Sequence, residues 1–323
     1  MATPVQLREP GAASAPASGS GLSRWAHWVL VANVVTQVGI VVSGGLVRLT
    51  GSGLGCPTWP QCVPGSYVPV VHQPQGIHKY IEFGNRSLTS VVGVVALAAL
   101  VVIVLDVRRR HRPRSLGWLA AAPLAGVAVQ AVLGGITVLT HLSPGTVAAH
   151  FLVSGLMVTA STVLLTRAQQ PDGPARPVVR PELRWVGRAL GGLSAVILVL
   201  GTVVTGSGPH SGDANAPARF GFDPRSVSWL HSDAVLLWFG LLLTLLVAMR
   251  LTDAPALARR RGAILLGVGL LQGVLGYAQY FAGLPIVMVA FHVLGACLFI
   301  VAVTRLLLAL SEREPAPPAP LRA

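Results

Sequence analysis

Eight long apolar runs constrain the fold of this chain more than any other feature of its sequence. Each is close to the roughly 20 residues that a helix needs to cross a bilayer, and 53% of all residues are hydrophobic while only 11% are charged. We therefore predict an all-α, polytopic membrane protein with eight transmembrane helices. The runs cover residues 25–47, 83–105, 116–139, 147–166, 186–205, 228–250, 262–281 and 285–308.

The formal net charge of +13 comes from basic residues that lie between the apolar runs. Connectors on one side of the predicted membrane contain 19 of the 24 Lys and Arg residues, and connectors on the other side contain 5. By the positive-inside rule, both termini are predicted to be cytoplasmic and the loop after the first run external, in a multi-pass protein of the cell membrane. Because the charges mark topology and form no basic face on a soluble fold, nucleic-acid binding is not expected.

Short motifs recur in the two halves of the chain. Residues 49–53 read Leu-Thr-Gly-Ser-Gly and residues 204–208 read Val-Thr-Gly-Ser-Gly. Gln130 and Gln272 each begin a Gln-x-Val-Leu-Gly motif, and each precedes a histidine by 20 residues. This internal similarity predicts two tandem, pseudo-symmetric four-helix bundles.

The repeat and the local composition together predict the domain boundaries. The proline-containing segment 169–184 is predicted to be a cytoplasmic linker between bundles at 23–168 and 185–310. Segments 1–22 and 311–323 are predicted to be disordered cytoplasmic tails because they are polar or proline-rich.

Three histidines fall inside even-numbered apolar runs, near the predicted external side. His150, His231 and His292 would lie in one layer of the bundle, where a histidine needs an interior partner. A satisfied interhelical hydrogen bond is one interpretation. The other is heme-iron ligation, because two imidazoles from facing helices suit heme, whereas zinc sites usually add cysteine or carboxylate ligands.

A polar stripe enters the second apolar run. His78, Glu82 and Asn85 share one helix face by their spacing, and Arg86 follows directly. Arg86 and Arg48, at the end of the first run, could bind carboxylates such as heme propionates, or could pair with Glu82 or lipid headgroups.

The first predicted external loop contains two of the three cysteines. Cys56 and Cys62 flank Pro-Thr-Trp-Pro-Gln on the oxidising side of the membrane, so a disulfide between them is plausible. Such a bond could be a structural staple or a redox-active pair. Cys297, in the last apolar run, is predicted to be part of the core.

These motifs together resemble the heme A synthase family (CtaA/COX15 type). The resemblance rests on Gly-Gly-Leu-Val-Arg-Leu-Thr-Gly-Ser-Gly-Leu at 44–54, Cys-Pro-x-Trp-Pro-x-Cys, Ile-Glu-Phe-Gly-Asn-Arg at 81–86, and the histidines of the fourth, sixth and eighth runs. It covers residues 25–308.

The resemblance implies oxidation of a ring methyl group of heme O to the formyl group of heme A, by successive hydroxylation. It implies that His231 and His292 hold a heme b in the C-terminal half and that His150 binds the substrate heme in the N-terminal half. Glu82 would be catalytic, with Asn85 and Arg86 beside it. A heme O synthase (a farnesyltransferase) and terminal oxidase assembly are implied as partners.

One position departs from the family pattern. Asn85 stands where many members have a histidine, so either His78 supplies the second ligand to the substrate heme or that iron has an open face. Two other functions compete with this interpretation. A membrane cytochrome b that only transfers electrons would not need Glu82, and a non-enzymatic heme chaperone would need one exchangeable site and no buried acid.

Overall fold

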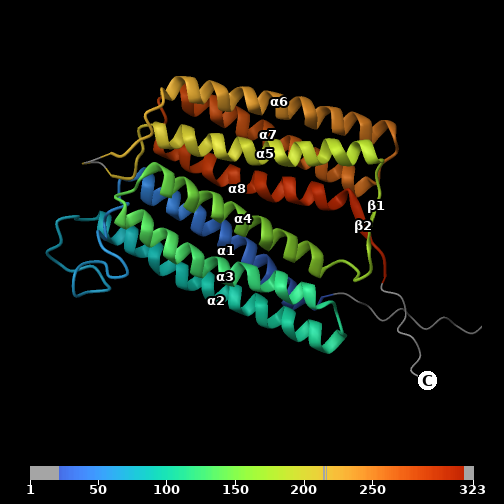
Figure 1. Ribbon diagram of the computed structural model, residues 1–323, viewed down its shortest axis with the longest axis horizontal. Helices are drawn as coiled ribbons and strands as arrows, with labels where there is room; N and C mark the ends of the chain where they lie inside the picture. Colours follow the sequence, from blue (N-terminus) through green and yellow to red (C-terminus); the bar gives the residue numbers. More distant parts are fainter. Residues whose placement is uncertain (1–21, 214, 216, 316–323) are drawn as a thin grey trace, which may run out of the picture.

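The helices run side by side in a single membrane-sized bundle (Figure 1). The computed structural model describes residues 22–213, 215 and 217–315, and in these residues all eight α-helices are long and apolar enough to cross a membrane. The predicted all-α, multi-pass membrane fold is therefore confirmed. The helices are α1 (Arg24–Leu49), α2 (His78–Arg110), α3 (Arg114–Leu139), α4 (Pro144–Ala168), α5 (Pro181–Ser207), α6 (Pro224–Leu251), α7 (Ala256–Phe281) and α8 (Ile286–Ala309).

Helix ends follow local sequence rules. The Ser23 hydroxyl accepts a hydrogen bond from the Ala26 amide at 3.2 Å and caps α1, and prolines occupy the first turns of α4, α5 and α6. Helix α2 is longer than the apolar run at 83–105, because it includes a polar turn at each end. His78, Glu82 and Arg86 therefore lie on the helix itself.

The two halves pack around a shared centre formed by α4 and α8. Helices α1–α4 form one group and α5–α8 the other (Figure 1). Helix α4 contacts α5 as well as α8, and α8 contacts α1 as well as α4. The repeat relates α1 to α5 and α4 to α8, so the α4–α5 contact corresponds to the α8–α1 contact. This is expected for a pseudo-two-fold relation between the halves.

Each half has its own apolar core, and a third cluster joins them. Trp238 belongs to the C-terminal core, and its side chain is only 1% exposed. Its indole N–H donates a hydrogen bond to the Ser194 hydroxyl at 2.9 Å. Val41, Val158, Cys297 and Ile300 form the cluster between the halves. Cys297 is buried and unpaired, which agrees with its predicted place in the core.

Two short strands tie the linker to the chain after α8. Strand β1 (Ala175–Pro177) pairs antiparallel with β2 (Ser311–Arg313). Neither strand was predicted, and Ser311–Arg313 had been assigned to a disordered tail. Local sequence patterns do not reveal a pairing between segments so far apart. The rest of the predicted tails, residues 1–21 and 316–323, lies outside the described residues.

A buried ion cluster lies on the same side of the bundle as these strands. Arg112 contacts Asp106 at 3.1 Å and Asp172 at 2.9 Å. Burial acts to lower the pKa of Arg112, but hydrogen bonds to both carboxylates more than offset this effect and raise it. The cluster therefore joins the end of α2 to the linker as a charged, fully paired group.

Candidate functional site

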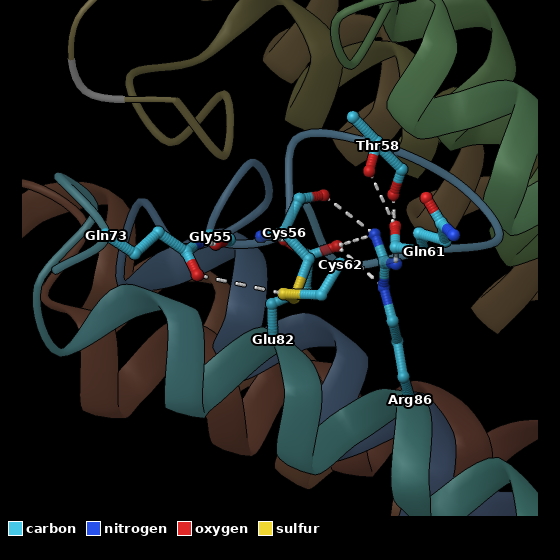
Figure 2. A network of polar contacts seen from close by, with 8 residues as sticks. All are labelled: Gly55, Cys56, Thr58, Gln61, Cys62, Gln73, Glu82 and Arg86. Carbon is cyan, nitrogen blue, oxygen red and sulfur yellow. Dashed lines mark hydrogen bonds and ion pairs between the residues drawn. A yellow bond between two sulfur atoms is a disulfide. The ribbon is translucent and has the colours of Figure 1, made fainter. Parts of the chain in front are cut away.

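The Glu82 carboxylate fixes the loop between α1 and α2 to the start of α2. Its Oε2 accepts the Cys56 amide at 2.7 Å, and its Oε1 accepts both Nη2 and Nε of Arg86 at 2.6 and 3.0 Å. Glu82 is only 5% exposed. Of the sequence alternatives for Arg86, the structure shows pairing with Glu82 (Figure 2).

Arg86 extends the same network into the loop. Its guanidinium donates to the carbonyls of Cys56 at 2.8 Å and Thr58 at 3.0 Å (Figure 2). A planar guanidinium can satisfy several acceptors at once. One ion pair on α2 therefore organises the backbone on both sides of the loop's first cysteine.

The loop is closed by a disulfide between Cys56 and Cys62, as predicted. It packs directly on the start of α2, because a Cβ at Gly55 would lie 2.2 Å from the His78 carbonyl oxygen. Only glycine fits such an approach. The Gln73 amide donates to the Gly55 carbonyl and holds this contact from the other side.

Trp59, inside the disulfide loop, packs on α3 next to the helix position that faces His150. A Cβ at Gly135 would lie 2.5 Å from the Trp59 ring, and a Cβ at the neighbouring Gly134 would lie 3.4 Å from His150 Cε1. The loop therefore covers the end of the N-terminal half near which His150 lies.

The three intramembrane histidines have matching surroundings. Each imidazole lies against a glycine of the preceding helix, with a virtual Cβ at 3.4 Å from Cε1: His150 against Gly134, His231 against Gly201 and His292 against Gly276. The Nδ1 atoms of all three are buried without a hydrogen-bond partner among the described residues. His231 also lies near the Ile197 carbonyl, but without normal hydrogen-bond geometry at Nδ1.

The repeated glutamines hold the helices that carry two of these histidines. The Gln130 amide donates to the His150 carbonyl at 3.0 Å, and the Gln272 amide donates to the His292 carbonyl at 3.1 Å. This contact explains the repeated spacing of 20 residues between glutamine and histidine. The glutamines fix backbone position and leave the imidazoles free of protein hydrogen bonds.

The surroundings of the histidines differ between the halves. A charge on His231 would act on His292, and among the described residues no second histidine acts on His150 in this way. Asn85 instead accepts a hydrogen bond from Ser43 at 2.7 Å, and Gly44 leaves room beside it. The two halves thus share helix geometry but differ in ligand set.

His78 and Arg48 make contacts that the sequence analysis did not predict. His78 Nδ1 lies 2.8 Å from the Ser52 hydroxyl. Arg48 donates to the carbonyls of His210 at 2.6 Å and Thr205 at 2.8 Å, in the C-terminal half. Next to them, the Gly53 amide donates to the Gly212 carbonyl at 2.9 Å. The Arg48 and Gly53 contacts join the two halves at the end of the bundle where the loop between α1 and α2 lies, whereas the His78 contact lies within the N-terminal half.

Several of these residues could not be singled out in advance. Ser52 and Gly53 belong to the repeated motif that the sequence analysis identified, but their partners come from distant segments. Ser43 had no distinguishing pattern beyond proximity to a motif, and Trp59 belongs to the two-cysteine motif, which does not show that its ring packs on α3. Gly134 and Gly276 end the repeated Gln-x-Val-Leu-Gly motif, but their contact with a histidine is seen only once the helices are packed.

The donor set fits heme better than a bare metal ion. Within the described part of the chain, no group of three or more His, Cys, Asp and Glu side chains is arranged to hold a metal ion. The alternative of satisfied interhelical histidine hydrogen bonds is not observed at Nδ1. Imidazoles carried by neighbouring helices of a bundle are typical heme-iron ligands.

The chain is similar to known cytochrome oxidase assembly proteins. The family model COX15-CtaA, described as cytochrome oxidase assembly protein, matches residues 26–211. These residues include Glu82 and His150, whereas His231 and His292 lie beyond them.

Curated relatives are similar over different shares of the chain. The Heme A synthase of Shouchella clausii (strain KSM-K16) is 30% identical over 232 residues, which are 66% of this chain and 73% of the relative. The Heme A synthase of Lysinibacillus sphaericus (strain C3-41) is 29% identical over 186 residues, 56% of this chain and 58% of the relative. That of Geobacillus kaustophilus (strain HTA426) is 30% identical over 138 residues, 42% of this chain and 41% of the relative.

Proposed function

Because the chain belongs to the COX15-CtaA family of cytochrome oxidase assembly proteins, we propose that it is a heme A synthase. The reaction is the oxidation of a ring methyl group of heme O to a formyl group, which makes the protein an oxidoreductase acting on a CH or CH2 group. One observation supports this function most directly: equivalent helices of the two halves place His150 and His292 against equivalent glycines, and only the N-terminal half adds a buried, ion-paired Glu82.

The N-terminal half binds the substrate in this proposal. His150 ligates the iron of heme O through its Nε2, and Asn85 leaves the opposite face of the ring without an imidazole. Gly134 and Gly44 have no side chain to project from the helix surfaces next to His150 and Asn85. His78, which contacts Ser52, then fixes the loop between α1 and α2 and is not needed as a second ligand.

Glu82 is the proposed acid or base for the reaction. The carboxylate accepts the Cys56 amide and two Arg86 donors, and the Gly55 amide also acts on it. As a general base it would exchange one of these contacts for a proton of the substrate. Arg86 and the Cys56 amide hold the carboxylate in place, and Asn85 borders the same site one turn along α2.

The C-terminal half holds the resident cofactor in this proposal. His231 and His292 would hold heme b, and Gly201 and Gly276 lie against their rings. Heme b would supply one-electron transfer. The Gln272 contact with the His292 carbonyl keeps that ligand's helix in register.

The remaining assignments follow from the same proposal. The Cys56–Cys62 loop faces outward and both termini face the cytoplasm of a cell-membrane protein. Heme O would come from a heme O synthase, a farnesyltransferase, and heme A would go to terminal oxidase assembly. In this proposal Arg48 positions a carboxylate at the external rim. Its Nε and Nη2 groups already donate to two backbone carbonyls, so its remaining donors would bind the carboxylate.

The experiment that tests this function identifies the pigment by mass. The full chain is expressed with a heme O source, membranes are extracted, and the hemes are analysed by mass spectrometry. We expect heme A together with heme b. Heme b alone would indicate a cytochrome b type electron-transfer protein, and unaltered heme O bound without conversion would indicate a heme chaperone. Either result would overturn the proposal.

A further inference from the structure

A groove between α7 and α8 combines two arginines with an apolar wall. It has a volume of about 230 Å³ and is lined by Arg261 and Arg305 together with Ile264, Val268, Leu298 and Val301. The groove lies near the start of α7 and the end of α8, on the side of β1 and β2. It is far along both helices from the histidine layer.

The two arginines have no acidic partner. In the described part of the chain, neither Arg261 nor Arg305 makes an ion pair or a hydrogen bond, and the Nε atom of Arg305 is buried without an acceptor. Their positive charges also repel each other. Two converging guanidinium groups at a bilayer boundary need an anion, and a phosphate accepts hydrogen bonds from such groups bidentately.

The apolar wall continues from the arginines toward the membrane interior. Ile264 and Val268 follow Arg261 along one face of α7, and Val301 and Leu298 precede Arg305 along α8. Seven residues of helix correspond to about 10 Å, so each wall runs about that far below its arginine. Ile264 is 41% and Leu298 46% exposed, which leaves the groove open to the bilayer.

The groove is not a requirement of the four-helix fold. The offset that relates Gln130 to Gln272 and His150 to His292 places Leu119 and Val163 at the positions equivalent to Arg261 and Arg305. The N-terminal half is therefore apolar where the C-terminal half has its two arginines. The charges are a specific property of α7 and α8.

We propose that this groove is a binding site for an anionic phospholipid of the bilayer. The phosphate is held between Arg261 and Arg305, and an acyl chain lies along the apolar walls. A zwitterionic lipid would bring a cation next to the two arginines, and a free phosphate ion would leave the walls uncovered. The site does not depend on the heme chemistry of the histidine layer.

The test measures lipid retained by the full chain. Purified protein is delipidated in detergent, titrated with phosphatidylglycerol or with phosphatidylcholine of the same acyl chains, and examined by native mass spectrometry. The Arg261→Gln/Arg305→Gln double variant removes both charges. The matched control is Arg259→Gln/Arg260→Gln, which removes the same charge from two exposed arginines of the same helix turn that do not line the groove.

We expect phosphatidylglycerol to bind the wild type in preference to phosphatidylcholine. Each basic residue near an anionic lipid surface contributes enough affinity that losing two should weaken binding roughly 30-fold, while the control stays near the wild type. Arg261→Lys/Arg305→Lys, which keeps the charge, should bind more tightly than the glutamine variant, and monodisperse elution of each variant reports its folding.

Three results would overturn the proposal. They are equal retention by the double variant and its matched control, equal retention of phosphatidylcholine by the wild type, and full displacement of phosphatidylglycerol by millimolar inorganic phosphate. The last result would identify a site for a free anion without any role for the apolar walls.

Discussion

The two halves of this protein have the same helix plan and different chemistry. Gln130 and Gln272 hold equivalent helices in equivalent ways, and His150 and His292 lie against equivalent glycines. Yet His292 has His231 nearby, while the N-terminal half has Asn85 bonded to Ser43 and Glu82 bonded into a disulfide loop. The comparison teaches that the repeat preserves the arrangement of the helices. Function depends on the few positions at which the two halves have different residues.

The largest expected effect comes from removing the acid that only the N-terminal half has. Glu82→Gln keeps the size of the side chain and one acceptor oxygen, which can still serve the Cys56 amide, although the ion pair with Arg86 is lost. Formation of heme A should fall about 10²–10⁴-fold, the usual contribution of a general acid or base. The absorption of the paired-histidine heme should not change. Undiminished conversion of heme O in the variant would contradict the catalytic role of Glu82.

The next effect tests whether the cores are independent. Trp238→Ala empties the centre of the C-terminal core, where the ring is 1% exposed. Because lipid is as apolar as this core, only the cavity left behind counts, and we expect a loss of roughly 2–3 kcal/mol in unfolding free energy. Thermal unfolding followed by loss of bound pigment measures it. Trp118→Ala, on the N-terminal half at 79% exposure, is the matched control and should change little.

A third substitution makes the halves more alike. Asn85→His places an imidazole one turn along α2 from Glu82, opposite His150 in the proposed substrate site. The heme of the N-terminal half should then acquire a low-spin, bis-histidine spectrum like that of the C-terminal half. Electron paramagnetic resonance of the two hemes reports the change. A spectrum identical to the wild type would mean that position 85 does not face the iron, and Asn85→Gln serves as the control without an imidazole.

The smallest effect concerns how equivalent helices begin. Asp223 caps α6 by accepting hydrogen bonds from the Ser226 hydroxyl and amide, at 2.7 and 2.8 Å, and these bonds lower its pKa. Helix α2 begins at Ile77 without a side-chain cap. A lowered carboxyl pKa stabilises the folded state above the unfolded value of about 3.9 and loses that contribution as pH falls through the folded value.

Hydrogen exchange across this pH range distinguishes the two helix starts. The first turn of α6 should exchange faster, after correction for intrinsic rates, once the pH drops below about 4, and the first turn of α2 should show no matching step. Asp223→Asn keeps an acceptor oxygen for the cap and should abolish the step. A step that persists in this variant would have to come from another group.

The sequence predicts the helices and their repeat well, because both depend on patterns that recur along the chain. Apolar length locates each of the helices, and the spacing between glutamine and histidine predicts the repeat, since Gln272 does hold the helix of His292. The resemblance in motifs also leads to the correct family. Glu82 was recognised because a carboxylate at the mouth of an apolar run needs a reason to be there.

The contacts that define the site depend on segments far apart in the chain and were not predictable in the same way. The partner of Glu82 is a backbone amide in the preceding loop, and no side-chain pattern marks which amide it will be. The sequence left the partner of Arg48 open, and the two carbonyls of the other half that it bonds belong to no pattern in the sequence. Gly55 belongs to no motif of its own. Position 55 requires glycine only because the loop lies directly on the His78 carbonyl.

The pairing of β1 with β2 also sets an order of events during synthesis. Strand β1 lies between α4 and α5, and its partner follows α8. Because a chain is made from its N-terminus, β1 must wait without a partner until the whole C-terminal half has been translated and inserted. The β1–β2 pair therefore forms last. A ribosome-bound chain that stops within α8 would have every helix of the first half in place, but its β1 strand would still be unpaired.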